Sequence, residues 1–197
     1  MKITEDLIIA SNNKHKVVEI KQILGDFFFF IYTLSDKNIN VEIEENGSTF
    51  EENALIKAKY ICELTGITTL SDDSGLEVEA LGGAPGVYSA RYAGKPSDSN
   101  KNNQKLLAEM KNVQNRNANF TSVIAICYPD GKTITAKGAT YGKILTQAEG
   151  NNGFGYDPLF FSNDLQKSFG IATAQEKNAI SHRGRALQKM KEILSKQ

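Results

Sequence analysis

Two apolar segments near the start of the chain differ in their spacing. Leu7–Ala10 is a continuous apolar run, typical of a short buried strand. Apolar residues at helical spacing then run from Val17 to Leu24 and stop at Gly25, a common residue after a helix. Ser11–Lys16, between them, supplies helix N-cap residues and two lysines. The pattern predicts a strand–loop–helix unit whose loop offers N–H groups and positive charge to an anion.

Further along the chain, segments of strand character alternate with segments of helical periodicity. We expect strands over 27–32 and 66–70, and between them a helix over 50–65 with a capping box of Thr49 and Glu52. A polar loop over 97–103 should lead into a helix over 104–110. A hairpin of 120–128 and 132–140 and a last helix from Ser181 should follow. Asp72 and Asp73 then follow a strand end, where α/β folds place ligands. We expect an α/β fold with a long central mixed sheet flanked by helices, in two lobes with a substrate cleft between them.

Composition excludes several classes of protein. The 197 residues are 40% hydrophobic, and 23 basic against 23 acidic residues leave no net charge, so we expect a single domain over 1–197 without a broad nucleic-acid-binding surface. No apolar run approaches the roughly 20 residues that span a bilayer. Met1–Asp6 carries acids where a signal peptide has basic residues, so we expect a cytoplasmic location. Cys62 and Cys127 lack zinc-site spacing and are expected to be buried, reduced thiols.

Two acidic pairs are candidates for metal binding. Asp72 and Asp73 precede a turn-prone Ser-Gly sequence, and their carboxylates suit a hard divalent cation such as Mg²⁺. Glu44 and Glu45 form a second pair in a predicted loop. Taken alone, each pair also fits an ordinary solvent-exposed turn.

A glycine-rich aromatic loop and a basic helix start favour a nucleotide ligand. Gly153–Pro158 combines glycines, which let the backbone approach a ligand, with rings that can face a base; a core aromatic in a turn is the alternative. Ser181–Arg185 adds arginines at a helix start, which suit phosphate oxygens. A 6-keto purine has an acceptor where adenine has an amino donor, so either a lysine such as Lys177 or a backbone N–H would favour a 6-keto base over adenine.

Together with Ser11–Lys16 and Ser71–Gly75, these motifs resemble the inosine triphosphate pyrophosphatase family, also called Ham1-like, from about Ile8 to Leu187. The resemblance implies hydrolysis of ITP, dITP and XTP to the monophosphate and pyrophosphate, which cleanses the nucleotide pool of deaminated purines. It also implies a Mg²⁺ cofactor and a homodimer that binds neither nucleic acid nor membrane.

The resemblance also implies which residues form the site. Asp73 is the expected catalytic residue, as base or metal ligand, and Glu44, three residues before Gly47, is the expected second metal ligand. The implied substrate-binding residues are Ser11, Asn12, Asn13, Lys14, His15, Lys16, Lys57, Ser74, Phe154, Gly155, Tyr156, Asp157, Lys177, His182 and Arg183.

Two other functions fit the same residues. One is a pyrophosphatase that removes modified pyrimidine or canonical nucleotides, which would differ in its base pocket. The other is a nucleotide sensor that binds without turnover.

Overall fold

The computed structural model describes residues 5–196. Residues 1–4 of Met1–Asp6, the segment compared above with a signal peptide, therefore lie outside the described residues. The strands are β1 (Leu7–Ile9), β2 (Ile31–Thr33), β3 (Thr69–Val78), β4 (Asn117–Cys127), β5 (Thr133–Ile144), β6 (Phe160–Ser162) and β7 (Lys167–Ser168). The α-helices are α1 (Lys14–Leu24), α2 (Phe50–Thr65), α3 (Ser99–Glu109), α4 (Ala174–Ile180) and α5 (His182–Leu194).

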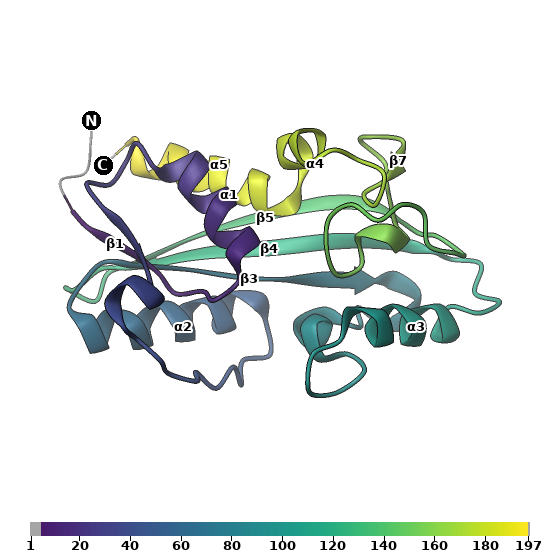
Figure 1. Ribbon diagram of the computed structural model, residues 1–197, viewed down its shortest axis with the longest axis horizontal. Helices are drawn as coiled ribbons and strands as arrows, with labels where there is room; N and C mark the ends of the chain where they lie inside the picture. Colours follow the sequence, from purple (N-terminus) through teal and green to yellow (C-terminus); the bar gives the residue numbers. More distant parts are fainter. Residues whose placement is uncertain (1–4, 197) are drawn as a thin grey trace. The chain divides into compact units, whose positions relative to one another are not determined.

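These strands form one sheet in the order β2-β1-β3-β4-β5-β6-β7 (Figure 1). β1 pairs in parallel with both β2 and β3, whereas β6 pairs antiparallel with β5 and β7. The predicted α/β fold with a mixed central sheet is therefore confirmed. Within the part of the chain described, no helix is long and apolar enough to cross a membrane.

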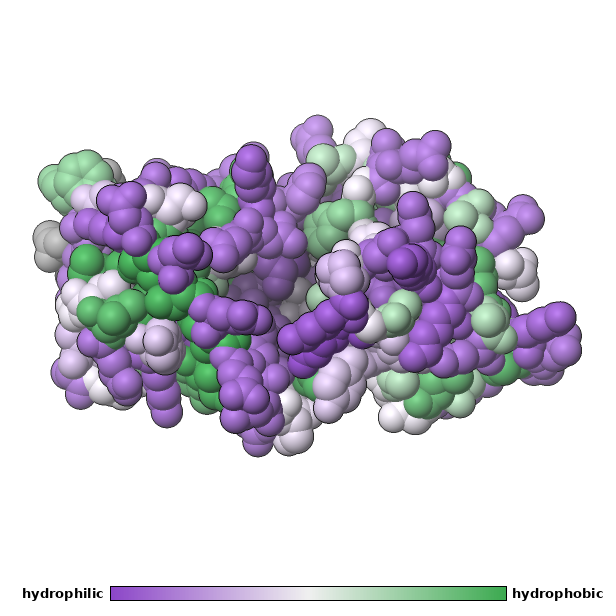
Figure 2. Space-filling view, turned by 60° about the horizontal axis from the view of Figure 1, so that its bottom comes forward, coloured by the Kyte–Doolittle hydropathy of each residue, from purple (hydrophilic) through white to green (hydrophobic). Residues whose placement is uncertain are grey.

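The chain divides into two compact units. Within the described range, the first contains residues 5–73, 122–138 and 183–196, and the second contains 74–121 and 139–182. Mostly hydrophilic side chains cover the surface in the view of Figure 2, with smaller hydrophobic areas between them. The predicted substrate cleft between two lobes stays a prediction.

In the first unit, helices cover both faces of the sheet. Leu7 and Ile9 of β1 pack with residues of α1 and α5, whereas Ile8 packs with Ile61 of α2. Alternate residues of a strand point to opposite faces, so α1 and α5 lie on one face and α2 on the other (Figure 1). The second unit has a separate core, in which Phe120, Phe160 and other apolar residues cluster.

Several predicted elements are confirmed. Helix α2 has the predicted bounds, and the capping box of Thr49 and Glu52 is present. α1 ends before Gly25 as predicted, and β4 and β5 form the predicted hairpin with longer strands. Cys62 and Cys127 are buried free thiols, as expected.

The strand predicted over 27–32 is wrong over 27–30. The N–H of Phe27 donates to the carbonyl of Leu24, and the chain turns here before β2 begins at Ile31. Since β1 and β2 are parallel, the chain must reverse after α1, and these aromatic residues supply that turn. Phe28 fills the core, while Phe29 and Phe30 are exposed.

Two other predicted elements have different bounds in the structure. β3 begins at Thr69 rather than Gly66 and continues past Leu70 through Asp72 and Asp73, so these carboxylates lie within a strand rather than at its end. Buried polar partners, described below, make this possible. The predicted loop over 97–103 is largely helical, because Asp98 caps α3 by accepting from the N–H of Lys101.

Candidate active site

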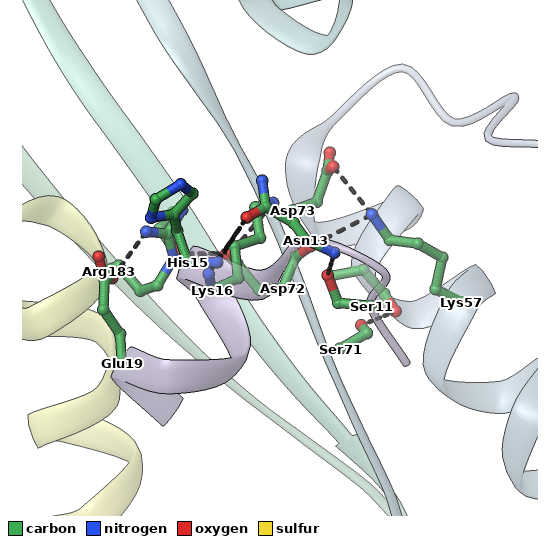
Figure 3. Close-up of polar contacts among 12 residues, drawn as sticks. Ser11, Asn13, His15, Lys16, Glu19, Lys57, Ser71, Asp72, Asp73 and Arg183 are labelled. Carbon is green, nitrogen blue, oxygen red and sulfur yellow. Dashed lines mark hydrogen bonds and ion pairs between the residues drawn. The ribbon is translucent and has the colours of Figure 1, made fainter. Parts of the chain in front are cut away.

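Asp72 is a fully buried carboxylate surrounded by donors (Figure 3). Its Oδ2 lies 3.0 Å from Nζ of Lys16 and accepts from Nε of Arg183 at 2.9 Å. The hydroxyl of Ser122 donates to Oδ1 at 2.6 Å. Burial alone would raise the pKa of Asp72, but the charges of Lys16 and Arg183 outweigh it and hold that pKa well below its usual range. Asp72 is therefore held as an anion.

Arg183 is itself held from two sides. Its Nη1 donates to Oε2 of Glu19 at 2.7 Å, and its side chain is 2% exposed. Glu19 and Ser122 were missed by sequence reasoning. Glu19 is three residues after Lys16 on α1, a spacing that places both on one side of the helix, but only the fold shows that α5 brings Arg183 there.

Asp73 lies beside Asp72 in sequence but belongs to another cluster. Its Oδ1 accepts from Nζ of Lys57 at 3.0 Å, and the same Nζ donates to Oε2 of Glu45 at 3.1 Å and to the carbonyl of Asp72 at 3.2 Å. Among residues 5–196, Oδ2 of Asp73 is buried without a hydrogen-bond partner. Burial raises the pKa of Asp73 despite the opposing charge of Lys57.

The start of α1 forms the third part of the site. Oδ1 of Asn13 accepts from the N–H groups of His15 and Lys16 at 3.0 and 3.3 Å, so the predicted N-cap is present. Ser11 accepts from the N–H of Asn13 at 3.2 Å. Asn12, Lys14 and His15 are exposed, whereas Lys16 turns inward to Asp72. The loop thus offers one exposed lysine, Lys14, and one partly buried lysine, Lys16.

The structure distinguishes the two glutamates predicted near the metal. Glu45 contacts Lys57 and is partly buried, while Glu44 is exposed. Among the described residues, no group of three or more His, Cys, Asp or Glu side chains is placed to hold a metal ion. The unsatisfied Oδ2 of Asp73 nevertheless suits a cation, and Mg²⁺ takes few protein carboxylates because water and phosphate oxygens complete its shell.

The second unit brings together the predicted base-binding residues. Nζ of Lys177 donates to Oδ2 of Asp157 at 2.6 Å, and both side chains are buried. The same oxygen accepts from the N–H of Phe154 at 2.7 Å. Lys177 Nζ also lies 4.6 Å from the ring centroid of Phe154 and 5.5 Å from that of Phe169. A charged donor is thus fixed beside an aromatic face.

Steric crowding explains why position 153 of this loop is a glycine. A Cβ on Gly153, whose φ is +76°, would lie 2.0 Å from Oδ2 of Asp157. Tyr156 belongs to the core and donates its hydroxyl to the carbonyl of Ser89 at 2.8 Å, so Phe154 is the less buried of the two rings. Nδ2 of Asn103 holds the carbonyl of Gly155 at 3.0 Å, a contact that sequence reasoning missed.

The remaining predicted residues flank these clusters. His182 is buried and stacks on Phe120, with ring centroids 4.9 Å apart and planes at 16°. Ser74 is partly buried in β3.

The fold and these clusters define an α/β protein with buried carboxylates beside lysines, and with a buried lysine, Lys177, beside aromatic rings. A sequence profile of the Ham1 family matches residues 7–193, and the chain belongs to that family. A dITP/XTP pyrophosphatase of Clostridium perfringens is 52% identical over 195 residues, covering 95% of this chain and 96% of the relative. The dITP/XTP pyrophosphatase of Bacillus subtilis is 42% identical over 196 residues, covering 98% and 99%.

Solved structures agree with this assignment. The Ham1 protein of Staphylococcus aureus superposes with a TM-score of 0.90 at 40% identity, covering 97% of this chain and 98% of its own. A HAM1 protein from Coxiella burnetii gives a TM-score of 0.91 at 39% identity, covering 98% and 100%.

Proposed function

We propose that this chain is a nucleoside triphosphate pyrophosphatase that hydrolyses ITP, dITP and XTP between the α and β phosphates, with residues 1–197 acting as one functional domain. Relatives that match nearly the whole chain are named dITP/XTP pyrophosphatases. The observation that carries the proposal is the ion pair of Asp73 and Lys57, in which one oxygen of the carboxylate has no hydrogen-bond partner among residues 5–196.

Asp73 is the proposed general base. Its raised pKa makes it a better proton acceptor than an ordinary aspartate, and its Oδ2 accepts no hydrogen bond from any of residues 5–196. Asp72 is unsuited to that role, because both its oxygens already accept from donors and its pKa is lowered. In the proposed reaction, water attacks the α phosphorus while one of its protons passes to Asp73. The bond between the α phosphorus and the bridging oxygen then breaks, which releases pyrophosphate and leaves the nucleoside monophosphate.

Positive groups around Asp73 would bind the triphosphate. Lys57 is anchored by two carboxylates, and Lys14 lies exposed at the start of α1, the positive end of the helix dipole. Ser11, Asn12 and Asn13 would contact phosphate oxygens from the same loop. Lys16 and Arg183 would act mainly by holding Asp72 in place.

Mg²⁺ is the proposed cofactor, with Asp73 and Glu44 as its protein ligands. Bound Mg²⁺ neutralises phosphate charge and orients the triphosphate. We favour Glu44 over Glu45, because the carboxylate of Glu45 already pairs with Lys57.

Phe154 and Lys177 would select the base. Phe154 offers a ring face, and Lys177, held by Asp157, offers a donor to a 6-keto oxygen. Adenine presents an amino donor at that position, which would leave Lys177 without an acceptor in the base.

The resemblance to the family further motivates a cytoplasmic location and a homodimer. Light scattering at several protein concentrations would test the homodimer.

A substrate panel tests the proposal. Inosine, deoxyinosine, xanthosine, guanosine, adenosine and pyrimidine triphosphates are offered with Mg²⁺, and pyrophosphate and orthophosphate are measured separately. We expect fastest turnover of the inosine and xanthosine nucleotides, with pyrophosphate as product. Preference for a pyrimidine or canonical nucleotide would support a different pyrophosphatase, and binding without turnover would support a sensor.

A further inference from the structure

Asn53, in the first turn of α2, is a fully buried polar residue at 0% exposure. Its Oδ1 accepts from the N–H of Gly47 at 2.8 Å. Because that N–H is a donor, it fixes the orientation of the amide, and Nδ2 must lie on the opposite side. Nδ2 has no hydrogen-bond partner within residues 5–196. Purely for packing, an apolar side chain would serve better here, since an unsatisfied buried donor is unfavourable.

Gly47 is fitted closely to this amide. A Cβ on Gly47 would lie 2.7 Å from Oδ1 of Asn53 and 2.7 Å from Cβ of Glu52. Both distances are shorter than van der Waals contact, so a side chain at Gly47 would push the loop away from α2.

Helix α2 contacts the loop of residues 44–47, here called the acidic loop, at two points. Lys57, one helical turn after Asn53, contacts Glu45, while Asn53 holds Gly47. The two anchored residues, Glu45 and Gly47, are two positions apart, and Glu44 directly precedes the first of them. The loop position therefore depends on a neutral hydrogen bond as well as on an ion pair.

We propose that Asn53 is a positioning residue, whose Oδ1 fixes the loop so that Glu45 stays beside Lys57 and the neighbouring Glu44 keeps its place. The proposal rests on the proposed function, in which this loop supplies a metal ligand. Asn53 acts through Gly47 and touches neither substrate nor metal. Its loss should therefore weaken Mg²⁺ binding by moving the loop, even though the charges of the site are unchanged.

The test compares four variants without substrate. Asn53→Leu removes the acceptor, Gly47→Ala displaces the loop without altering the helix, and Asn53→Asp keeps an acceptor for Gly47. Ala58→Gly, at another buried position of α2, is the control for loss of helix stability. Amide hydrogen exchange of Gly47 and Ser48 is measured by NMR in metal-free protein, and Mg²⁺ alone is titrated by calorimetry.

We expect Asn53→Leu and Gly47→Ala to speed exchange of the Gly47 amide by at least about tenfold and to weaken Mg²⁺ binding about 10- to 100-fold, the range found for groups that orient metal ligands. Asn53→Asp should keep Gly47 protected, and Ala58→Gly should lower only Tm. Wild-type Mg²⁺ affinity in both Asn53→Leu and Gly47→Ala would overturn the proposal. If Asn53→Leu does not fold, Gly47→Ala decides. Failure of the wild type to hydrolyse any triphosphate would instead count against the proposed function, since exchange at Gly47 is measured without turnover.

Discussion

Asp72 and Asp73 are adjacent in β3, yet their carboxyl pKa values are shifted in opposite directions. Successive residues of a strand point to opposite faces of the sheet. Asp72 therefore meets Lys16 of α1 and Arg183 of α5, whereas Asp73 meets Lys57 of α2 (Figure 3). One dipeptide thus supplies a fixed anion on one face and a carboxyl group with a raised pKa on the other.

Replacing Asp72 should reduce stability far more than replacing Asp73. Asp72→Asn leaves Lys16 and Arg183 buried without their shared counter-charge, and breaking such a pair typically costs about 3–5 kcal/mol. Asp73→Asn removes a carboxylate that burial already disfavours, so the free energy of unfolding should change little. Urea denaturation at neutral pH measures both variants. Equal losses in the two would contradict the division of roles.

The same carboxylate should make the fold sensitive to acid. The pKa of Asp72 is lower in the folded state than in the unfolded chain, so its contribution is complete above the unfolded value of about 4 and declines as the pH falls below it. Urea denaturation of wild type and Asp72→Asn between pH 6 and about pH 3 measures this. We expect the wild type to lose more stability on acidification, and parallel pH profiles would exclude Asp72 as the cause.

The two glutamates of the acidic loop can be separated by matched substitutions. Glu44→Gln should weaken Mg²⁺ binding by about tenfold or more, because it removes a proposed ligand. Glu45→Gln should have a smaller effect on Mg²⁺ affinity, since that carboxylate is paired with Lys57. Calorimetric titration with Mg²⁺ ranks the variants. The reverse order would assign the metal to Glu45.

Base selectivity should depend on Lys177 and not on Lys14. An unsatisfied buried group costs roughly 1–3 kcal/mol, so ITP should exceed ATP in kcat/KM by at least about tenfold. Lys177→Ala should reduce that ratio, while Lys14→Ala should weaken both nucleotides similarly, because phosphate contacts do not read the base. Steady-state kinetics with both substrates measure the ratio. An unchanged ratio in Lys177→Ala together with a changed one in Lys14→Ala would mean that the two ends were assigned in reverse.

Local sequence signals predicted much of the fold. The capping box at Thr49 and the apolar spacing of α1 are determined by residues close in sequence, so both were predicted correctly. The strand character of Asp72 and Asp73 was missed, because acidic residues normally end strands. Only partners distant in sequence, such as Arg183, allow these acids to lie within a buried strand.

In the candidate site, too, contacts between residues close in sequence were predicted, whereas contacts between distant residues were not. An N-cap within Ser11–Asn13 was predicted, and Asn13 supplies it, because a cap bonds to N–H groups only two and three residues away. Glu19 and Asn53 carry no local signal, since a glutamate and an asparagine within helices usually face solvent. Their burial depends on packing against Arg183 and Gly47, which sequence spacing alone does not show.

Hydrolysis of ITP by wild type and Asp73→Asn tests the central claim most directly. Both proteins are purified free of metal, reconstituted with Mg²⁺ and assayed for inosine monophosphate and pyrophosphate. We predict that the wild type forms both products in equal amounts. Turnover by Asp73→Asn should fall about 100- to 10,000-fold, the usual contribution of a general base. Activity of Asp73→Asn within about twofold of wild type would remove Asp73 from the mechanism and contradict the account.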